Sequence, residues 1–255
     1  MKIAVITGAS SGMGRDFARQ LDQTGNYEQL WVIARREERL LTLKEELKTP
    51  VKVFPMDLTK QEDLERYAAE LEKEKPQVLT LVNAGGFGKF GRVEQIPLSD
   101  CMGMIDVNCK ALVSMTQLTL PYMERGSAVI ELGSLSAFQP VPYLNVYAAS
   151  KAFVLSYSRA LNVELKPRGI RVMAVCPGWV KTEFFDRATK TSNDAVTYYN
   201  VFSESADVVR TALRDLKRGK DVSVHNFRVR AQVRLVKLLP HKWVMNIWMK
   251  QQKHG

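Results

Sequence analysis

Three residues in the middle of the chain have side chains that could move a proton on and off an oxygen atom: Ser134, Tyr147 and Lys151. Tyr147 and Lys151 are four residues apart in a segment with helical periodicity, so they should lie one turn apart on one helix face. A free tyrosine ionises only near pH 10. One cation at ~5 Å supplies roughly 3 kcal/mol in favour of the phenolate at an effective dielectric of about 20. We therefore expect Lys151 to lower the pKa of Tyr147, and Tyr147 to act as a general acid and base.

The Tyr-x-x-x-Lys spacing means little by itself. A chain with eight tyrosines should contain about half of one such match by chance. A tyrosine–lysine contact on a helix surface is therefore the competing interpretation. The acid–base interpretation is favoured only if another part of the chain predicts a binding site for a redox cofactor.

A glycine-rich turn near the N-terminus predicts such a site. Residues 3–7 are a short β-branched apolar run, which is typical of a strand buried on both faces. Gly8-Ala-Ser-Ser-Gly12-Met-Gly14 follows at once, and helical periodicity runs from Arg15 to Thr24. Glycine permits a sharp turn and close backbone approach, and a helix start offers N–H groups to a phosphate. This order predicts a dinucleotide site, the alternative being a merely tight strand–helix turn.

Two arginines follow the second expected strand, residues 30–34. In dinucleotide-binding folds an acid near this strand end binds the ribose 2′-hydroxyl, whereas an arginine accepts a 2′-phosphate. Arg35 and Arg36 stand here and no acid does, so we expect a preference for NADP(H), with NAD(H) as a second cofactor. For Arg36 we favour a solvated side chain at a helix start.

Helices and strands alternate through the rest of the chain, at the spacing of βαβ units. We expect helices at 37–48, 60–73, 99–122 and from Tyr147 to about 167, and strands at 51–56, 78–82, 128–132 and 171–176. The pattern predicts an α/β fold with a Rossmann-type doubly wound parallel sheet in a single domain, residues 1–226. Residues 227–255 form a basic, amphipathic C-terminal extension.

Composition excludes several classes of function. The net charge is +10, but residues 228–255 alone hold seven Lys/Arg and no acid, so the body lacks the basic face of a nucleic-acid-binding domain. Three cysteines among apolar neighbours predict buried free thiols in a reducing cytoplasm. The three histidines lack metal-ligand spacing, and we expect no metal. No segment has the length of a membrane span.

Together these residues resemble the short-chain dehydrogenase/reductase family over nearly the whole chain. Thr7-Gly8-x-x-x-Gly12-x-Gly14 resembles its cofactor glycine motif. Asn83-Ala84-Gly85 resembles its Asn-Asn-Ala-Gly motif, with Val82 in place of the first asparagine. Pro177-Gly178-x-x-x-Thr182 matches the segment that contacts the nicotinamide amide. The catalytic tetrad is matched in order and spacing by Asn108, Ser134, Tyr147 and Lys151.

The resemblance implies a role for each of these residues. Tyr147 would exchange the proton with the substrate oxygen, which Ser134 would orient and polarise. Lys151 would bind the nicotinamide ribose, and Asn108 would hold a water that relays protons to solvent. The expected cofactor site comprises Gly8, Ser10, Ser11, Gly12, Met13, Gly14, Arg35, Asp57, Leu58, Asn83, Ala84, Gly85, Tyr147, Lys151, Pro177, Gly178, Val180 and Thr182.

The substrate should be walled by residues 86–92, 136–144 and 179–202. Their aromatic side chains favour a bulky apolar ketone or alcohol, such as a hydroxysteroid or a long acyl chain. A broad-range carbonyl reductase is the nearest alternative, and a non-catalytic NADP(H)-binding sensor is the alternative of another class. We expect a homo-oligomer, either a dimer or a tetramer. The expected substrate contacts are Ser134, Phe138, Tyr143 and Phe184.

The C-terminal extension interleaves apolar and basic residues on both sides of Pro240. Three interpretations remain open: a lid over the substrate pocket, a dimer contact, or an interfacial helix pair on anionic lipid. We favour the lid slightly, because Pro240 divides the segment into two short pieces.

Overall fold

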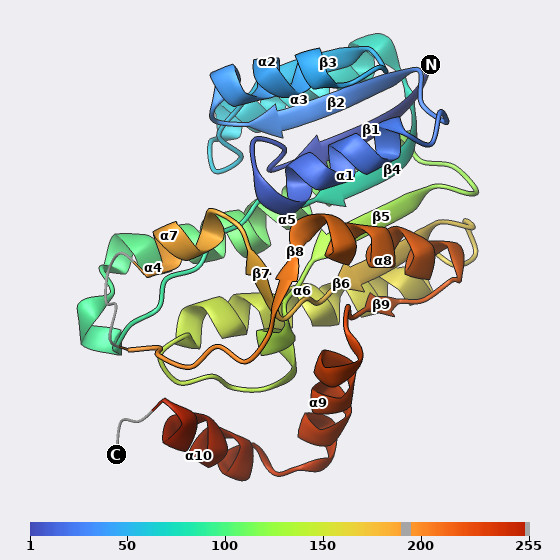
Figure 1. Ribbon diagram of the computed structural model, residues 1–255. Coiled ribbons are helices and arrows are strands. Elements are labelled where there is room, and N and C mark those ends of the chain that lie inside the picture. The colour runs from blue at the N-terminus through green and yellow to red at the C-terminus, as the bar shows by residue number, and fades with distance from the viewer. Residues whose placement is uncertain (190–194, 253–255) are drawn as a thin grey trace.

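A seven-stranded parallel sheet runs through the centre of the computed structural model, which describes residues 1–189 and 195–252 (Figure 1). The strand order is β3-β2-β1-β4-β5-β6-β9. The order reverses between β1 and β4, and ligands bind at such a reversal in open α/β sheets. The predicted Rossmann-type sheet is therefore confirmed. The strands are β1 (Lys2–Thr7), β2 (Gln29–Ala34), β3 (Val51–Pro55), β4 (Gln77–Asn83), β5 (Ala128–Leu132), β6 (Arg171–Val175) and β9 (Val222–Ser223).

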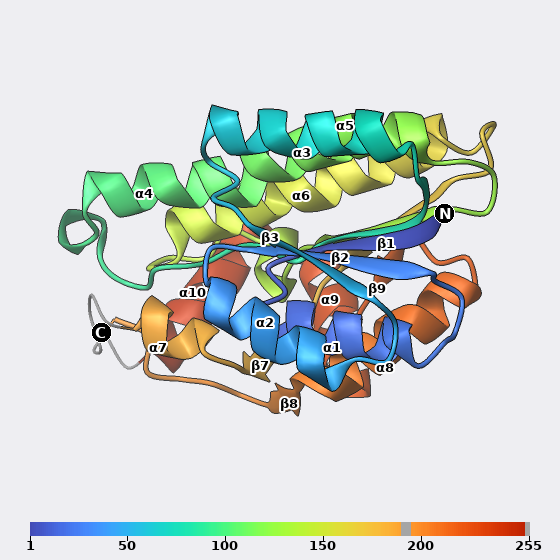
Figure 2. The same cartoon turned by 90° about the horizontal axis from the view of Figure 1, so that it is seen from above.

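Helices cover both faces of this sheet (Figure 2). One face carries α1 (Gly12–Asp22), α2 (Glu37–Glu46) and α8 (Ser205–Lys217). The other carries α3 (Gln61–Glu74), α4 (Leu98–Ile105), α5 (Leu112–Thr119) and α6 (Asn145–Glu164).

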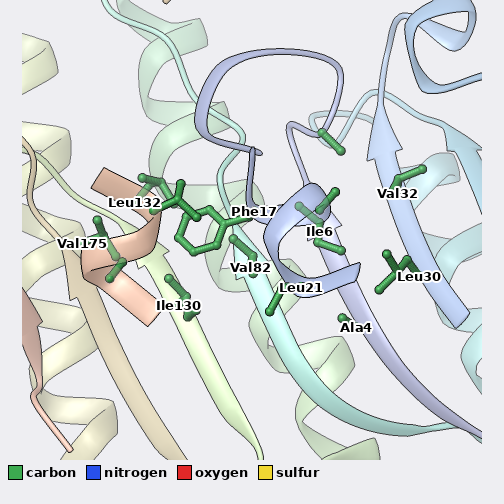
Figure 3. Packing of buried hydrophobic residues seen from close by; sticks show 14 of the residues in the cluster. Ala4, Ile6, Phe17, Leu21, Leu30, Val32, Val82, Ile130, Leu132 and Val175 are labelled. Atoms are coloured by element: carbon green, nitrogen blue, oxygen red, sulfur yellow. The ribbon is translucent and has the colours of Figure 1, made fainter. Parts of the chain in front are cut away.

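Alternate side chains of the buried strands enter the two helix–sheet interfaces, which explains why the strands read as continuous apolar runs. Figure 3 shows Phe17 and Leu21 of α1 directed at Ile6, Val82 and Ile130 of the sheet.

The predicted helix at 99–122 is interrupted. A π-helical segment, Asp106–Ala111, lies between α4 and α5 and contains Asn108. Such wide turns are frequent at functional sites, because they change the direction of one side chain. The periodicity of the sequence gave no sign of this interruption.

A small parallel sheet and a short helix, none of them predicted, cover the carboxyl edge of the large sheet. The small sheet pairs β7 (Trp179–Lys181) with β8 (Phe202–Glu204), and α7 (Phe184–Ala188) lies between them in sequence. The middle of the predicted wall 179–202, and the end of the chain with His254, lie outside the described residues.

The C-terminal extension forms two helices, α9 (Phe227–Leu238) and α10 (His241–Gln251), with Pro240 between them. Figure 1 shows both helices extending away from the sheet, beyond α6. On α9, Val229 and Val233 are buried against Ala174 and Cys176. Within residues 1–189 and 195–252 no helix is long and apolar enough to cross a membrane.

Candidate active site

Ser134, Tyr147 and Lys151 meet at the carboxyl end of β5. Ser134 follows β5, and the other two lie in the first two turns of α6. The Lys151 Nζ donates to the Leu132 carbonyl oxygen at 2.6 Å and lies 5.8 Å from the centroid of the Tyr147 ring. Tyr147 and Lys151 are both less than a tenth exposed. The structure therefore brings together the three residues that were selected from the sequence.

Burial dominates the acidity of this pair. Burial raises the pKa of Tyr147 to about 12, although hydrogen bonding with Ser134 acts in the opposite direction. Burial also lowers the pKa of Lys151 to about 8. In the protein by itself, the pKa of Tyr147 is therefore not lowered as expected, because removing the phenol from water is the largest effect on it. At neutral pH Tyr147 is a protonated acid.

Asn108 is held by its own hydrogen bonds beneath the site. Its Oδ1 accepts the Phe87 N–H at 3.0 Å, and its Nδ2 donates to the Phe87 carbonyl at 2.9 Å and to Ser150 Oγ at 3.0 Å. The π-helical segment supplies the turn that aims this amide at the strand end. The water relay expected of Asn108 stays a prediction.

Gly86 also lies at the site, although from the sequence it was expected only as part of the substrate wall at residues 86–92. A Cβ on Gly86 would lie 2.9 Å from Asn108 Oδ1 and 3.4 Å from Lys151 Nζ. The close approach of the chain to Asn108 and Lys151 thus requires glycine here. In the sequence, only its position directly after Gly85 indicated that Gly86 belongs to the site.

A long cavity of about 880 Å³ crosses the carboxyl ends of β1, β2 and β4. Ser11 caps α1 without a side-chain hydrogen bond, so the N–H groups of the first turn remain available to a phosphate. Gly8 has a φ of +67°, and a Cβ there would lie 2.7 Å from the Gly85 nitrogen. Twelve of the predicted cofactor residues line this cavity: Gly8, Ser10, Ser11, Gly12, Met13, Gly14, Arg35, Asp57, Leu58, Ala84, Gly85 and Thr182.

Asn83 is a correction to the predicted cofactor site. Its side chain points into the protein interior, where Nδ2 donates to Thr116 Oγ1 at 3.0 Å and to Glu131 Oε1 at 3.3 Å. Asn83 thus joins β4 to β5 and α5 beneath the cavity instead of lining it.

Arg36 is a second correction, because its side chain is not simply solvated. Its Nη2 donates to Ser10 Oγ at 3.2 Å and to Ser11 Oγ at 3.0 Å, and its Nη1 lies 3.0 Å from Glu183 Oε2. Arg39 also pairs with Glu183. Arg35, Arg36 and Arg39 all line the cavity at the end of β2, where a 2′-phosphate would be bound.

Asp57 lies at the same end of the cavity and is ionised. Burial would raise the pKa of Asp57, but the hydroxyl and N–H of Thr59 both donate to its carboxylate and hold the pKa below its ordinary value. Its place after β3 is the one predicted.

Glu131 is an unpredicted buried acid on β5. It is fully buried, and its Oε1 accepts from Thr116 Oγ1 at 2.9 Å and from Asn83. Burial raises the pKa of Glu131 to about 8. One charged residue inside the otherwise apolar run 128–132 was the signal in the sequence.

A second cavity, of about 350 Å³, adjoins the first above Tyr147 and Ser134. The two cavities meet beside Tyr147, because five residues line both of them: Met13, Ala84, Gly86, Thr182 and Phe184. Five further predicted cofactor residues line this second cavity: Tyr147, Lys151, Pro177, Gly178 and Val180.

Two of the four predicted substrate contacts lie elsewhere. Phe138 packs against the core beneath α9, with Lys237 over its ring at 5.1 Å. Tyr143, with a φ of +66°, packs in the apolar cluster that also contains Phe90 and Tyr147, but it does not line the cavity. Only Ser134 and Phe184 of the four line the second cavity. The cause is local, since the turns at 135–138 and 141–144 direct the other two side chains away.

The second cavity has apolar walls, and α9 and α10 supply part of them. The two helices contribute Val236, Leu239, Val244 and Trp248 to the lining, which also includes Val141, Leu144 and Phe185. Trp248 Nε1 donates to the Pro142 carbonyl at 3.0 Å, which fixes α10 to the loop before α6. Among the described residues that line this cavity, Lys151 is the only one with a cationic side chain.

Comparison with known proteins relates the chain to one family. The family model described as short chain dehydrogenase matches residues 2–193. Sulfoacetaldehyde reductase 2 of Chromohalobacter salexigens is 38% identical over 188 residues, which are 71% of this chain and 74% of that protein.

Two solved structures share the fold over almost the full length. A short-chain dehydrogenase from Sphingobium yanoikuyae in complex with NADPH has a TM-score of 0.80 and 27% identity, and the match covers 100% of this chain and 98% of that one. The bulky-bulky ketone specific alcohol dehydrogenase from Comamonas testosteroni has a TM-score of 0.74 and 26% identity, covering 93% and 92%. With its sheet, its glycine turn and its matched family model, the chain belongs to the short-chain dehydrogenase/reductase family of oxidoreductases.

Proposed function

We propose that this protein is an NADPH-dependent reductase that converts bulky, uncharged ketones to secondary alcohols. The observation that carries the proposal is the apolar cavity above Tyr147 and Ser134, whose described lining offers no cation except Lys151. Such a cavity favours a large neutral substrate, because an anionic group inside it would meet no cation besides Lys151.

The cofactor assignment rests on the long cavity. The open glycine turn and the first turn of α1 suit a pyrophosphate, and Arg35, Arg36 and Arg39 suit a 2′-phosphate. The NADPH bound to the Sphingobium relative supports this choice. NAD(H) remains the second cofactor. When bound, the nicotinamide supplies the hydride.

The residues of the chain handle the proton. Tyr147, protonated at neutral pH, donates to the carbonyl oxygen. Ser134 Oγ accepts the Ser136 N–H at 3.2 Å and is hydrogen-bonded with Tyr147, so its hydroxyl lies beside the reacting phenol and polarises the same carbonyl oxygen. Lys151, anchored on the Leu132 carbonyl, stabilises the phenolate that the transfer leaves behind. Reduction requires Tyr147 in its protonated form, which is the form present at neutral pH.

The proposed substrate differs from that of the sulfoacetaldehyde reductase and resembles that of the ketone-specific alcohol dehydrogenase. A sulfonate is a permanent anion, so a site for sulfoacetaldehyde needs a cation to bind it. The described lining has only Lys151, which the proposed mechanism uses at the Tyr147 phenolate. A bulky ketone, the substrate class named for the relative from Comamonas, suits the apolar cavity better. A hydroxysteroid or a long-chain keto compound has a suitable size and polarity. A broad-range carbonyl reductase is the nearest alternative, and a non-catalytic NADP(H) sensor has no need for the Ser134–Tyr147–Lys151 arrangement.

The test is a panel of ketones assayed by NADPH absorbance. We expect turnover of steroid ketones and bulky aryl ketones at a kcat/KM at least tenfold above that of sulfoacetaldehyde. Tyr147→Phe should lower kcat by about 10²–10⁴-fold. Equal turnover by Tyr147→Phe would contradict the mechanism, and faster turnover of sulfoacetaldehyde would contradict the substrate class.

A further inference from the structure

The two C-terminal helices expose an unusual amount of apolar surface. Five of the fifteen large apolar side chains that are exposed in the described part of the chain lie on α9 and α10, which have only 23 residues. Leu238 and Trp243, on either side of Pro240, are 84% and 60% exposed. We call this surface the tail face and define its apolar members as Phe227, Leu235, Leu238, Trp243 and Ile247.

Basic side chains surround these apolar residues. No acid occurs between residues 222 and 255, so nothing on this segment offsets their charge. Cations beside protruding leucine and tryptophan side chains are typical of a helix that lies in the interface of a bilayer. The described cations of the two helices, all exposed, are Arg228, Arg230, Arg234, Lys237, Lys242 and Lys250.

We propose that the tail face docks on an anionic lipid surface, with its apolar side chains in the headgroup region and its cations on the lipid phosphates. Each Lys or Arg near such a surface contributes roughly 1 kcal/mol, which the exposed apolar side chains supplement. No helix of the described residues spans a membrane, so this contact is peripheral.

Charge favours lipid over a second copy of the chain. A two-fold contact through the tail face would place the same surface on both partners. Cations would then face cations, with no acid from residues 222–255 between them.

The substrate cavity opens toward the same surface. Leu235 and Ile247 line the cavity, yet they are 57% and 51% exposed, so they form its rim on the tail face. An apolar ketone dissolved in the bilayer would therefore reach Tyr147 without crossing water. This last point rests on the proposed function, whereas the docking itself does not.

The experiment is sedimentation of the full chain with vesicles of phosphatidylglycerol and phosphatidylcholine, and with vesicles of phosphatidylcholine alone. We expect binding to the anionic vesicles that weakens as salt is raised. Arg230→Gln/Arg234→Gln should weaken it by about 30-fold, since two contributions of this size are lost. Leu238→Ser/Trp243→Ser should weaken binding at high salt as well as at low salt.

The matched control is Lys44→Gln/Lys73→Gln, which removes the same charge from α2 and α3 at the opposite end of the molecule (Figure 1). Circular dichroism and the melting temperature check that each variant is folded. Equal binding to both kinds of vesicle, or equal losses in the control and the Arg230/Arg234 variant, would overturn the proposal. So would a halved mass in solution for Leu238→Ser/Trp243→Ser without any vesicle binding, which would identify a subunit contact. None of these outcomes depends on turnover of a ketone.

Discussion

Arg36 and Glu183 form an ion pair across the cofactor cavity, with Nη1 and Oε2 3.0 Å apart. Arg36 precedes α2, and Glu183 follows the Thr182 that faces Gly12. The same guanidinium holds Ser10 and Ser11 of the glycine turn. One side chain therefore connects three segments that are distant in sequence, and Glu183 occupies arginines that a 2′-phosphate would also use.

Glu183→Gln should tighten NADPH binding and leave NADH binding unchanged. The carboxylate competes with the 2′-phosphate for Arg36 and Arg39, and exposed ion pairs of this kind contribute roughly 0.2–1 kcal/mol, or up to about fivefold. Fluorescence titration with both cofactors measures the effect. Glu46→Gln is the control, because Glu46 pairs with Arg15 and Arg19 instead. An equal change for NADPH and NADH would show that Glu183 does not compete.

Arg35→Ala and Arg36→Ala should each weaken NADPH far more than NADH. Each removes a charge-assisted contact worth roughly 1.5–3 kcal/mol, or about 10- to 150-fold in Kd. Arg36→Ala should also weaken NADH somewhat, because the glycine turn loses its hydrogen bonds from Arg36. If either variant affects both cofactors equally, that arginine does not bind the 2′-phosphate, and Arg39, which lines the same end of the cavity, is the next candidate.

The sequence was sufficient for the parts of the site that depend on strand ends. Glycine after β1, Asp57 after β3 and Ser134 after β5 follow from local patterns and from the rule that such sheets bind ligands at their carboxyl edge. The part played by Arg36 could not be predicted, since its partner Glu183 is 147 residues away. The inward turn of Asn83 likewise depends on Glu131 and Thr116. Short turns decide where aromatic side chains point, and for that reason Phe138 and Tyr143 were misplaced.

Glu131→Gln should remove a pH dependence of stability. The pKa of Glu131 rises from 4.5 to about 8 on folding, chiefly through burial. Its contribution is thus fully present below the unfolded pKa and is lost as the pH rises through the folded pKa. Lys151, whose pKa falls from 10.5 to about 8, acts in the separate window above pH 8 and in the opposite sense.

Urea unfolding near pH 5 and near pH 8 measures this effect. The free energy of unfolding of the unmodified protein should fall between these values by more than that of Glu131→Gln, by an amount on the order of a few kcal/mol. Glu45→Gln, an exposed glutamate on α2, is the control. The same fall in Glu131→Gln as in the unmodified chain would show that Glu131 is already ionised in the fold.

Trp248→Ala should raise the KM for bulky ketones by about tenfold, since losing a half-buried aromatic contact of this size costs roughly 1.4 kcal/mol. Trp248 lines the proposed substrate cavity and fixes α10 through the Pro142 carbonyl, whereas Trp243, five residues earlier on the same helix, is exposed. Trp243→Ala is therefore the matched control, and it should leave the KM unchanged. NADPH affinity should persist in both variants, because the long cavity receives no residue from α10.

Deleting residues 240–255 should act as Trp248→Ala does, with some loss of solubility. Steady-state kinetics with a large and a small ketone measure the contrast. An unchanged KM for the large ketone in Trp248→Ala and in the deletion would exclude a lid function for α10.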